Sequence, residues 1–506
     1  MAQEAQDATL PLETKQQRAA EVINRLSHEL AQLKVHTARQ AAVIEQLTEE
    51  NERLTEENAA LERRIQELEA QVREQAARLG QHSGNSSRPP STDPPGTPPP
   101  ARRTRTGRNR GGQPGHDKHE RSLVPPEKVT RTHVVKPQTC RCCGKALHGE
   151  DPKPDRHQVV EIPKVAAEVD EYQLHTLTCD ECGASTRASL PPGVPTGDFG
   201  PRLQATVALS SGAYKMSKRE IEQMVEDFFG VPISLGSIAN LEQATSEAIA
   251  APVAEVAQAI QKQPVAHADE TGWYERSKRA WLWGVIASTM ALFAIRASRG
   301  AKVAQELLGA AFAGILVSDR WSGYAWVDTA RRQICWAHLL RQFRGFQDRG
   351  PEAQRIGESL ELLTEAMFHA WHRVRDGTMT RASFRTFVES LRPHVVAWLE
   401  QGASSGVRGV AGRCREILDL EPALWTFAFV EGVEPTNNAA ERILRPGVLW
   451  RKRSFGTDSP NGSRFVERIL TVVTTLRLQK RHVLDYLTAA CQAAISGDSA
   501  PSLLPT

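Results

Sequence analysis

The chain has 506 residues, a length that predicts several domains rather than a single hydrophobic core. Its formal net charge is only +3, so the overall charge selects no class of partner and only local clusters of charge are informative. No apolar run is long enough to cross a membrane and no secretion signal follows Met1, which excludes a membrane protein and predicts a cytoplasmic one. Eight cysteines in so long a chain do not form a disulfide scaffold.

A heptad repeat runs through residues 24–79, where apolar residues recur at two of every seven positions. The first position holds Leu26, Leu33, Leu47, Leu54, Leu61 and Leu68. The second holds Leu30, Ile44, Asn51, Asn58, Ile65, Val72 and Leu79. This pattern predicts a leucine-zipper coiled coil over residues 20–80 and, through it, a homodimer or a larger assembly, with the asparagines favouring an in-register pair. Thr37 and Gln40 interrupt the seam, and a long solvated helix is the alternative.

Residues 81–124 are rich in proline and arginine and predict a disordered linker, because such a composition cannot build a core. A basic cluster lies within this linker and includes Arg102, Arg103 and Arg105. Flexible arginines can lie along DNA phosphates and release counterions, so these three are candidate DNA contacts. A solvated linker without a partner explains the composition equally well.

Residues 125–195 contain two Cys-x2-Cys pairs, each followed by a glycine: Cys140 with Cys143, and Cys179 with Cys182. Four thiolates bind Zn²⁺ tetrahedrally and fold a small module that has little core of its own. The zinc is expected to be structural because four thiolates leave no open coordination position, and Cys142 is a spare thiol. Alternating apolar and polar residues predict a strand around Val165–Leu177.

Residues 196–255 predict a helical segment. Ser217 is a candidate N-cap for a helix with an apolar face formed by Ile221, Met224, Val225 and Phe228. After a break at Gly230, either Ser234 or Ser237 opens a second helix. The arrangement resembles a helix-turn-helix (HTH) DNA-binding segment, although helical hairpins are as common without DNA.

Residues 256–480 predict an α/β catalytic domain. Strands are expected at 264–269, 281–286, 290–296 and 314–318, with a helix at 301–308 before the last of them. This β-β-β-α-β order is that of an RNase H-like fold. Alternation along the first strand places Asp269 on one face with Val265 and His267, and Glu270 on the other. An α-helical insertion is expected at about 341–425 and a C-terminal helix and tail at 481–506.

Asp269, Asp319 and Glu441 are the candidate catalytic residues. Asp269 lies within the first strand, Asp319 ends the buried fourth strand, and Glu441 lies near the start of a helix with Thr436 as its predicted cap. Three such carboxylates can hold two Mg²⁺ (or Mn²⁺) ions that clamp the attacking and leaving oxygens of a phosphodiester exchange.

Amides and cations surround the third acid and are candidate DNA contacts: Asn437, Asn438, Arg442, Arg451 and Lys452. A helix that carries one acid beside dense cations suits phosphate chemistry better than a plain solvated face. His338 and Arg341 are two further candidates for contact with phosphate. Cys335 and His338 also resemble half of a metal site, but no matching second half is evident in the sequence.

Together these motifs resemble the insertion sequence 66 family of bacterial transposases over most of the chain. The motifs that carry the resemblance are the leucine zipper, Asn85–Pro90, Gly111–His116, the paired cysteines, Asp269–Trp273, Ser318-Asp319, Cys335–His338, Asn437–Arg442, Arg445-Pro446 and Arg451-Lys452. The resemblance implies a DDE-type transposase in which Asp269, Asp319 and Glu441 are the catalytic triad. Two positions depart from it: Leu340 replaces the first of two arginines, and Arg320-Trp321 follow Asp319 in place of a smaller residue.

The expected function is therefore transposition: binding the terminal inverted repeats of an insertion sequence, then metal-dependent DNA cleavage and strand transfer into target DNA. Small accessory proteins of the same element are expected partners. A zinc-dependent DNA-binding regulator derived from a transposase, without cutting activity, is the main alternative. A coiled-coil scaffold with an inert globular part and a nuclease that hydrolyses without joining are two others.

Overall fold

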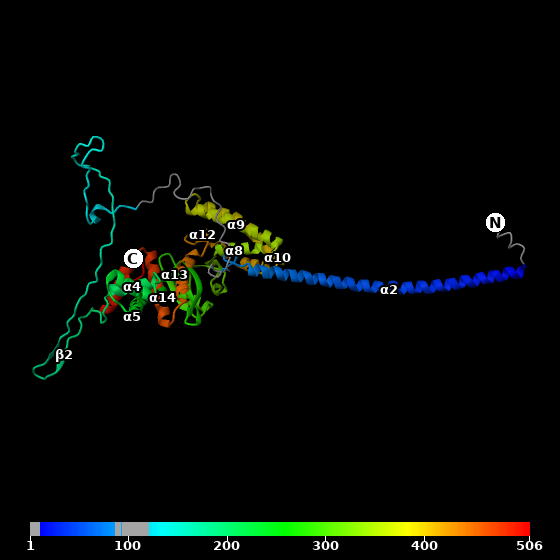
Figure 1. The fold of residues 1–506 in the computed structure, drawn as a ribbon, viewed down its shortest axis with the longest axis horizontal. Coiled ribbons are helices and arrows are strands. Elements are labelled where there is room, and N and C mark those ends of the chain that lie inside the picture. Colours follow the sequence, from blue (N-terminus) through cyan, green and yellow to red (C-terminus); the bar gives the residue numbers. More distant parts are fainter. Residues whose placement is uncertain (1–10, 87–92, 94–120, 506) are drawn as a thin grey trace.

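The computed structural model describes residues 11–86, 93 and 121–505. The predicted basic cluster with Arg102, Arg103 and Arg105 lies outside these residues. Figure 1 shows three parts of the described chain: the long helix α2, an extended segment, and a globular part that contains helices α3–α15 and the main sheet. None of the helices in the described ranges combines the length and the apolar composition that crossing a bilayer requires.

Helix α2 spans Leu12–Leu79 without a break, so the helix predicted by the heptad repeat is confirmed. Its apolar seam is exposed, with Leu47 at 54% and Ile65 at 54% of full exposure. The C-terminal end of α2 contacts the globular part, where Arg408 Nε lies 2.7 Å from Glu74 Oε2. Just beyond the helix, Asn85 Nδ2 donates to Asp348 Oδ2 at 3.0 Å. The seam therefore projects from an anchored base, and its pairing with a second chain stays a prediction.

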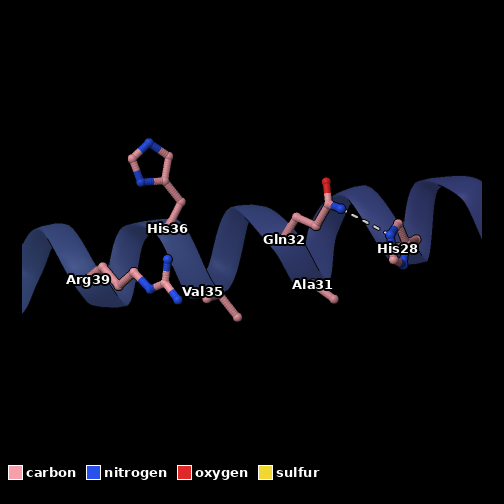
Figure 2. A pocket seen from close by; sticks show the side chains of 6 residues that line it. All are labelled: His28, Ala31, Gln32, Val35, His36 and Arg39. Carbon is pink, nitrogen blue, oxygen red and sulfur yellow. Dashed lines mark hydrogen bonds between the residues drawn. The ribbon is translucent and has the colours of Figure 1, made fainter.

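Six side chains in the N-terminal half of α2 outline a shallow depression on the surface (Figure 2). They are His28, Ala31, Gln32, Val35, His36 and Arg39. Within it, Gln32 Nε2 and His28 Nε2 are 3.0 Å apart. All six belong to one exposed helix, so the depression is a space between side chains of neighbouring turns rather than an enclosed binding site.

The segment 121–195 contains little regular structure. Its elements are η2 (Pro126–Lys128) and an antiparallel pair, β1 (Thr176–Thr178) with β2 (Ser185–Arg187). The predicted strand around Val165–Leu177 is wrong over most of its length, because only its last two residues join β1. Alternation alone does not make a strand when no neighbouring strand offers hydrogen bonds and no core covers the apolar side chains.

Four helices precede the main sheet: α3 (Pro201–Gly212), α4 (Lys218–Phe229), α5 (Leu235–Ala248) and α6 (Ala250–Ile260). Ser217 caps α4 as predicted, in a capping box with Glu220. Ser234, rather than Ser237, caps α5. Of the predicted apolar face of α4, Ile221 and Val225 are buried, whereas Phe228 is 69% exposed.

The main sheet has five strands: β3 (Val265–Glu275), β4 (Lys278–Ile286), β5 (Ala291–Arg296), β6 (Ile315–Ser318) and β7 (Arg332–Ile334). Their order is β5-β4-β3-β6-β7; the first two neighbouring pairs are antiparallel and the last two parallel. Helix α7 (Ala301–Leu308) connects β5 to β6, so the predicted β-β-β-α-β order is confirmed. Strand β7 was not predicted, since three residues with two polar side chains carry no strand pattern.

Helices cover both faces of the sheet. On one face, Leu282 and Phe293 pack with Ile443 and Leu444 of α13 (Asn438–Ser454). On the other face, Trp283 and Val285 belong to a core shared with α6, α7 and two late helices, α14 (Pro460–Leu478) and α15 (Val483–Ser496). The alternation of side chains along β4 decides which face each residue joins.

Helix α14 also protects the outer edge of the sheet. Its side chains accept from backbone N–H groups of β5: Thr475 Oγ1 from Ala291 at 3.1 Å, Thr471 Oγ1 from Phe293 at 3.0 Å, and Glu467 Oε1 from Ile295 at 2.5 Å. The acceptors are spaced four residues apart along α14, and together they bind every second residue of β5. An edge strand satisfied in this way cannot pair with another chain.

A helical insertion separates β7 from α13. Its main helices are α8 (Trp336–Gln347), α9 (Pro351–Arg375), α10 (Arg381–Ser404) and α11 (Ala411–Asp419), followed by η5 (Glu421–Leu424) and α12 (Thr426–Phe429). They enclose a second core in which the rings of Trp371 and Phe427 meet edge to face at 5.2 Å. The helical nature of this region is confirmed, and it begins at Trp336, a few residues earlier than predicted.

The contact between α13 and β4 depends on Gly447. A Cβ on Gly447 would overlap Leu282 Cδ2, and Leu282 is fully buried and cannot move aside. We expect Gly447→Ala to lower the free energy of unfolding by about 1–3 kcal/mol through overpacking, measured by urea denaturation. Gly412→Ala is the matched control, because a Cβ there meets nothing within 4 Å. Equal effects of the two substitutions would contradict this account of the packing.

Candidate active site

The pairing of β3 with β6 brings Asp269 and Asp319 together. The strands are parallel, and His267 lies opposite Val317. Asp269 is two residues beyond His267 within β3, and Asp319 is two residues beyond Val317, just past the end of β6. Both carboxylates therefore arise at the same level of the sheet. The predicted face of Asp269 is confirmed, because Thr271 and Trp273, the next residues on that face, contact α13.

Glu441 joins them because the start of α13 is fixed to β3 and α8. Asn437 Nδ2 donates to the Ala268 carbonyl at 2.8 Å, and Asn437 N donates to Cys335 Sγ at 3.2 Å. The predicted cap Thr436 is wrong: Asn437 occupies the N-cap position, and no side chain caps the helix. The Asn437 side chain instead bonds the strand. Asn438 begins the helix and is exposed.

The charges of the three acids act on one another. Burial raises the pKa of Asp269 well above its usual range, and the charges of Glu270, Asp319 and Glu441 raise it further. Burial also raises the pKa of Glu441, as does Asp319, whereas Arg341 opposes the shift. Carboxylates that are buried and mutually repulsive favour a bound cation. Their all-oxygen donor set suits Mg²⁺ or Mn²⁺.

Glu270, a fourth acid, points to the opposite face of β3 and is already paired. Arg299 Nε donates to Glu270 Oε1 at 2.6 Å, and Tyr324 Oη donates to Oε2 at 2.7 Å. The Arg299 guanidinium lies 4.6 Å from the centre of the Trp321 ring, and Trp321 N donates to Asp319 Oδ1 at 2.9 Å. This network holds the loop that carries Asp319. Sequence reasoning missed Arg299 and Tyr324, since neither lies near an acid in the chain.

The first two turns of α8 face Glu441. His338 Nδ1 lies 3.7 Å and Arg341 Nη2 3.8 Å from Glu441 Oε1. Burial, with Arg341 and Arg320, lowers the pKa of His338 to about 3, so the ring is neutral. Cys335, His338 and Glu441 place one ligand atom each within 4.8 Å of one another. The sequence did not reveal that Glu441 lies beside Cys335 and His338.

The other predicted DNA contacts fall into two groups. Arg442 and Lys452 are exposed on α13, where Arg445 is exposed as well. Arg451 instead donates to the Gly272 carbonyl and, at 3.3 Å, to Thr271 Oγ1, so it fastens α13 to β3.

Helices α4 and α5 offer few cations for a DNA groove. Lys218 Nζ lies 3.3 Å from Glu242 Oε2, and α5 contains no lysine or arginine. Helix α5 contributes to the core formed with α3, α14 and α15. The exposed cations Arg442, Arg445 and Lys452 instead lie on α13, the helix that carries Glu441.

The two cysteine pairs adopt the same local turn. Gly144 N donates to the Cys140 carbonyl, and Gly183 N donates to the Cys179 carbonyl, both at 2.9 Å. Both glycines have positive φ angles, +72° and +70°, which a side chain would strain. Backbone N–H groups from the second half of each pair lower the pKa of the Cys140 and Cys179 thiols. Each pair thus has the shape of half a thiolate site.

The structure does not bring the two halves together. Figure 1 shows the cyan part of the chain, which carries the first pair, well apart from the β2 hairpin, which carries the second. In the described ranges, the group formed by Cys335, His338 and Glu441 is the only one of its kind whose ligand atoms converge within 4.8 Å. The four-thiolate zinc module stays a prediction.

Comparison with known proteins gives matches to two families and to two relatives. The Family of unknown function (DUF6444) matches residues 8–122. Two relatives come from Sinorhizobium fredii (strain NBRC 101917 / NGR234). Uncharacterized protein y4qI is 29% identical over 239 residues, which cover 42% of this chain and 43% of y4qI, less than half its length. Uncharacterized protein y4hP is 24% identical over 400 residues, 70% of each chain.

The remaining match covers the sheet, the helical insertion and all three acids. It extends over residues 196–464, more than half of the 506 residues, and its family is described as Transposase IS66 family. The chain therefore belongs to the transposase IS66 family.

Proposed function

We propose that this chain is a DDE-type transposase whose catalytic domain has an RNase H-like fold. Membership of a transposase family implies action on DNA in general terms, and the chemistry is inferred from the site. The strand order β5-β4-β3-β6-β7, with two antiparallel and two parallel pairings, supports the fold. The observation that carries the proposal is the parallel pairing of β3 with β6, which places Asp269 and Asp319 at the same level of the sheet. Glu441 lies near enough for its charge to raise the pKa of Asp269, and Asp319 raises the pKa of Glu441.

Asp269, Asp319 and Glu441 would hold two Mg²⁺ (or Mn²⁺) ions, which when bound supply Lewis-acid activation and neutralise developing charge. Hydrolysis at the end of the element would leave a 3′-hydroxyl group. That hydroxyl would then displace an oxygen of a target phosphodiester in the same site. The exchange needs no serine or tyrosine nucleophile.

DNA would approach along α13. Its exposed cations Arg442, Arg445 and Lys452 lie on the helix that carries Glu441, so phosphates bound there would lead toward the acids. Asn438, exposed at the first turn, is a further phosphate contact in this proposal. The linker arginines Arg102, Arg103 and Arg105 would add to the same interaction. Binding would weaken steeply as salt rises.

The coiled coil, the zinc module and the helical segment would assemble the enzyme and direct it to the ends of the element. The coiled coil of α2 would pair two chains so that two element ends are held at once. The zinc module and the helical segment α3–α5 would grip the terminal inverted repeats. Small accessory proteins of the same element would complete the assembly.

A cutting and joining assay tests this function. Labelled DNA that carries the inverted repeats flanking the gene is incubated with Mg²⁺ or Mn²⁺ and with wild type or Glu441→Gln. We expect metal-dependent cutting and joining by the wild type alone. Binding without cutting by either protein would instead support the regulator, and cutting without joining a simple nuclease.

The zinc module has its own test. We expect Cys143→Ser and Cys179→Ser to lose bound zinc, measured by elemental analysis, and to leave 125–195 open to limited proteolysis. Cys142→Ser is the matched control, because it removes a neighbouring exposed thiol that is not a predicted ligand. Unchanged zinc in the two ligand variants, or an equal loss in the control, would contradict the four-thiolate site.

A further inference from the structure

The carboxylate of Glu441 lies beside two polar side chains at the start of α8, His338 and Arg341, which together form the seat of Glu441. His338 Nδ1 is 3.7 Å and Arg341 Nη2 3.8 Å from the same oxygen, Oε1. His338 Nδ1, Arg341 Nε and Glu441 Oε1 are all buried without a hydrogen-bond partner. Buried polar atoms of this kind are costly, and both separations are only slightly longer than a hydrogen bond. A hydrogen bond between Glu441 Oε1 and either group would give both buried atoms a partner.

The seat is itself fixed in place. Cys335 occupies the N-cap position of α8 and is fully buried. Its Sγ accepts from Asn437 N at 3.2 Å, and Trp336 N donates to the Pro435 carbonyl at 2.9 Å. Two hydrogen bonds therefore join the starts of α8 and α13, one between backbone atoms and one from a backbone N–H to the Cys335 sulfur. The position of His338 relative to Glu441 follows from these bonds rather than from flexible surface contacts.

The sulfur, nitrogen and oxygen of Cys335, His338 and Glu441 also match the donors of a soft metal such as Zn²⁺. Two features argue against that reading. The Arg341 guanidinium already lies 3.8 Å from Glu441 Oε1, the oxygen that faces His338. The Cys335 sulfur already accepts a backbone N–H.

We propose that His338 and Arg341 are positioning residues that hold Glu441 through Oε1 and leave its other oxygen free to ligate a catalytic Mg²⁺. This inference rests on the proposed function, because it assigns Glu441 the role of a metal ligand. His338 orients the carboxylate, and Arg341 offsets the charge of a carboxylate that is two-thirds covered. Neither residue touches the reacting phosphate in this arrangement.

The Mn²⁺ affinity of variants at His338 and Arg341 distinguishes a positioning role of these residues from a purely structural one. In the full-length protein, we expect His338→Leu and Arg341→Met to raise the Mn²⁺ concentration for half-maximal cutting about 10–100-fold. In the same two variants, we expect the cutting rate at saturating Mn²⁺ to fall by a smaller factor than the Mn²⁺ affinity. Mn²⁺ binding without DNA, followed by electron paramagnetic resonance, weakens in parallel. His338→Asn and Arg341→Lys, which keep a polar group or the charge, restore part of the affinity.

Arg344→Met is the matched control. Arg344 lies one turn further along α8 and pairs with Glu361 at 2.6 Å rather than with Glu441. We expect it to change stability but not the Mn²⁺ midpoint. An unchanged midpoint in His338→Leu and Arg341→Met would overturn the proposal, as would weaker DNA binding with normal Mn²⁺ binding.

Two other results decide the remaining alternatives. Zinc bound by the wild type and lost specifically in Cys335→Ser would overturn the proposal in favour of a soft-metal site. If the wild type does not cut DNA at all, the proposed function fails, but the Mn²⁺ binding of the variants still tests the seat. A normal Mn²⁺ affinity in both variants would then overturn the positioning role as well.

Discussion

Asp269→Asn is expected to abolish metal-dependent DNA cutting and, in the metal-free protein, to raise stability. Burial and three neighbouring acids raise the pKa of Asp269 well above its usual range. A carboxyl with such a shift is harder to ionise in the folded state than in the unfolded chain. At neutral pH its negative charge therefore lowers the free energy of unfolding, and asparagine removes that charge with little change of shape.

The expected sizes follow from the roles of the side chain. Losing a ligand of metals that contribute several kcal/mol to the transition state slows cutting at least about a thousandfold. Relief of the repulsion raises the free energy of unfolding by on the order of 1 kcal/mol, or roughly 2–4 °C in melting temperature for a domain of this size. Thermal unfolding in a chelator and cutting in Mn²⁺ measure the two effects separately.

Glu270→Gln provides the contrast, since Glu270 is the next residue on the opposite face. Burial raises the pKa of Glu270, but its carboxylate accepts hydrogen bonds from Arg299 and Tyr324, which oppose that rise. Removing the carboxylate charge leaves Arg299, whose side chain is 37% exposed, without its partner. We expect a loss of about 1–3 kcal/mol, the opposite sign to Asp269→Asn. Destabilisation by both substitutions, or cutting by Asp269→Asn, would contradict the roles assigned to these acids.

Local patterns predicted the parts of this site that depend on local geometry. Alternation along β3 places Asp269 and Glu270 on opposite faces, and an apolar run ending at Asp319 places that residue at the end of a buried strand. Both follow from the two-residue repeat of a strand, which is visible in the order of neighbouring residues. The capping box at Ser217 was predictable for the same reason, because its partners are three residues apart.

The contacts that complete the site could not be predicted, because they join residues far apart in the chain. Glu441 meets His338 across the helical insertion. Asn437 was predicted to act beside Glu441, but its side chain bonds β3, which no spacing along α13 reveals. Arg451, a predicted DNA contact, fastens α13 to β3 for the same reason. Composition identifies such groups as polar, and only the packing of helices against the sheet decides which polar groups remain free.

The apolar seam of α2 could be predicted as a repeat, but a single chain does not show what covers it. Leu47, Leu54 and Leu61 are 54%, 44% and 55% exposed, respectively. Burying a leucine contributes roughly 1.5–3 kcal/mol, so a second seam is the natural partner. Asn51 and Asn58, on the same face, favour pairing in register with an identical chain. The two element ends required for transposition would then be held by one assembly.

Replacing Leu47, Leu54 and Leu61 together by glutamate is therefore expected to separate the chains. Light scattering should report the mass of a single chain, and circular dichroism should lose helical signal, because an unpaired helix is marginally stable in water. The control replaces Gln46, Ala60 and Gln66 by glutamate, adding the same charge on the outer face of α2, where the assembly should persist. Separated chains should retain metal-dependent cutting of one end and lose paired-end joining. An unchanged mass in the leucine variant would place the assembly elsewhere in the chain.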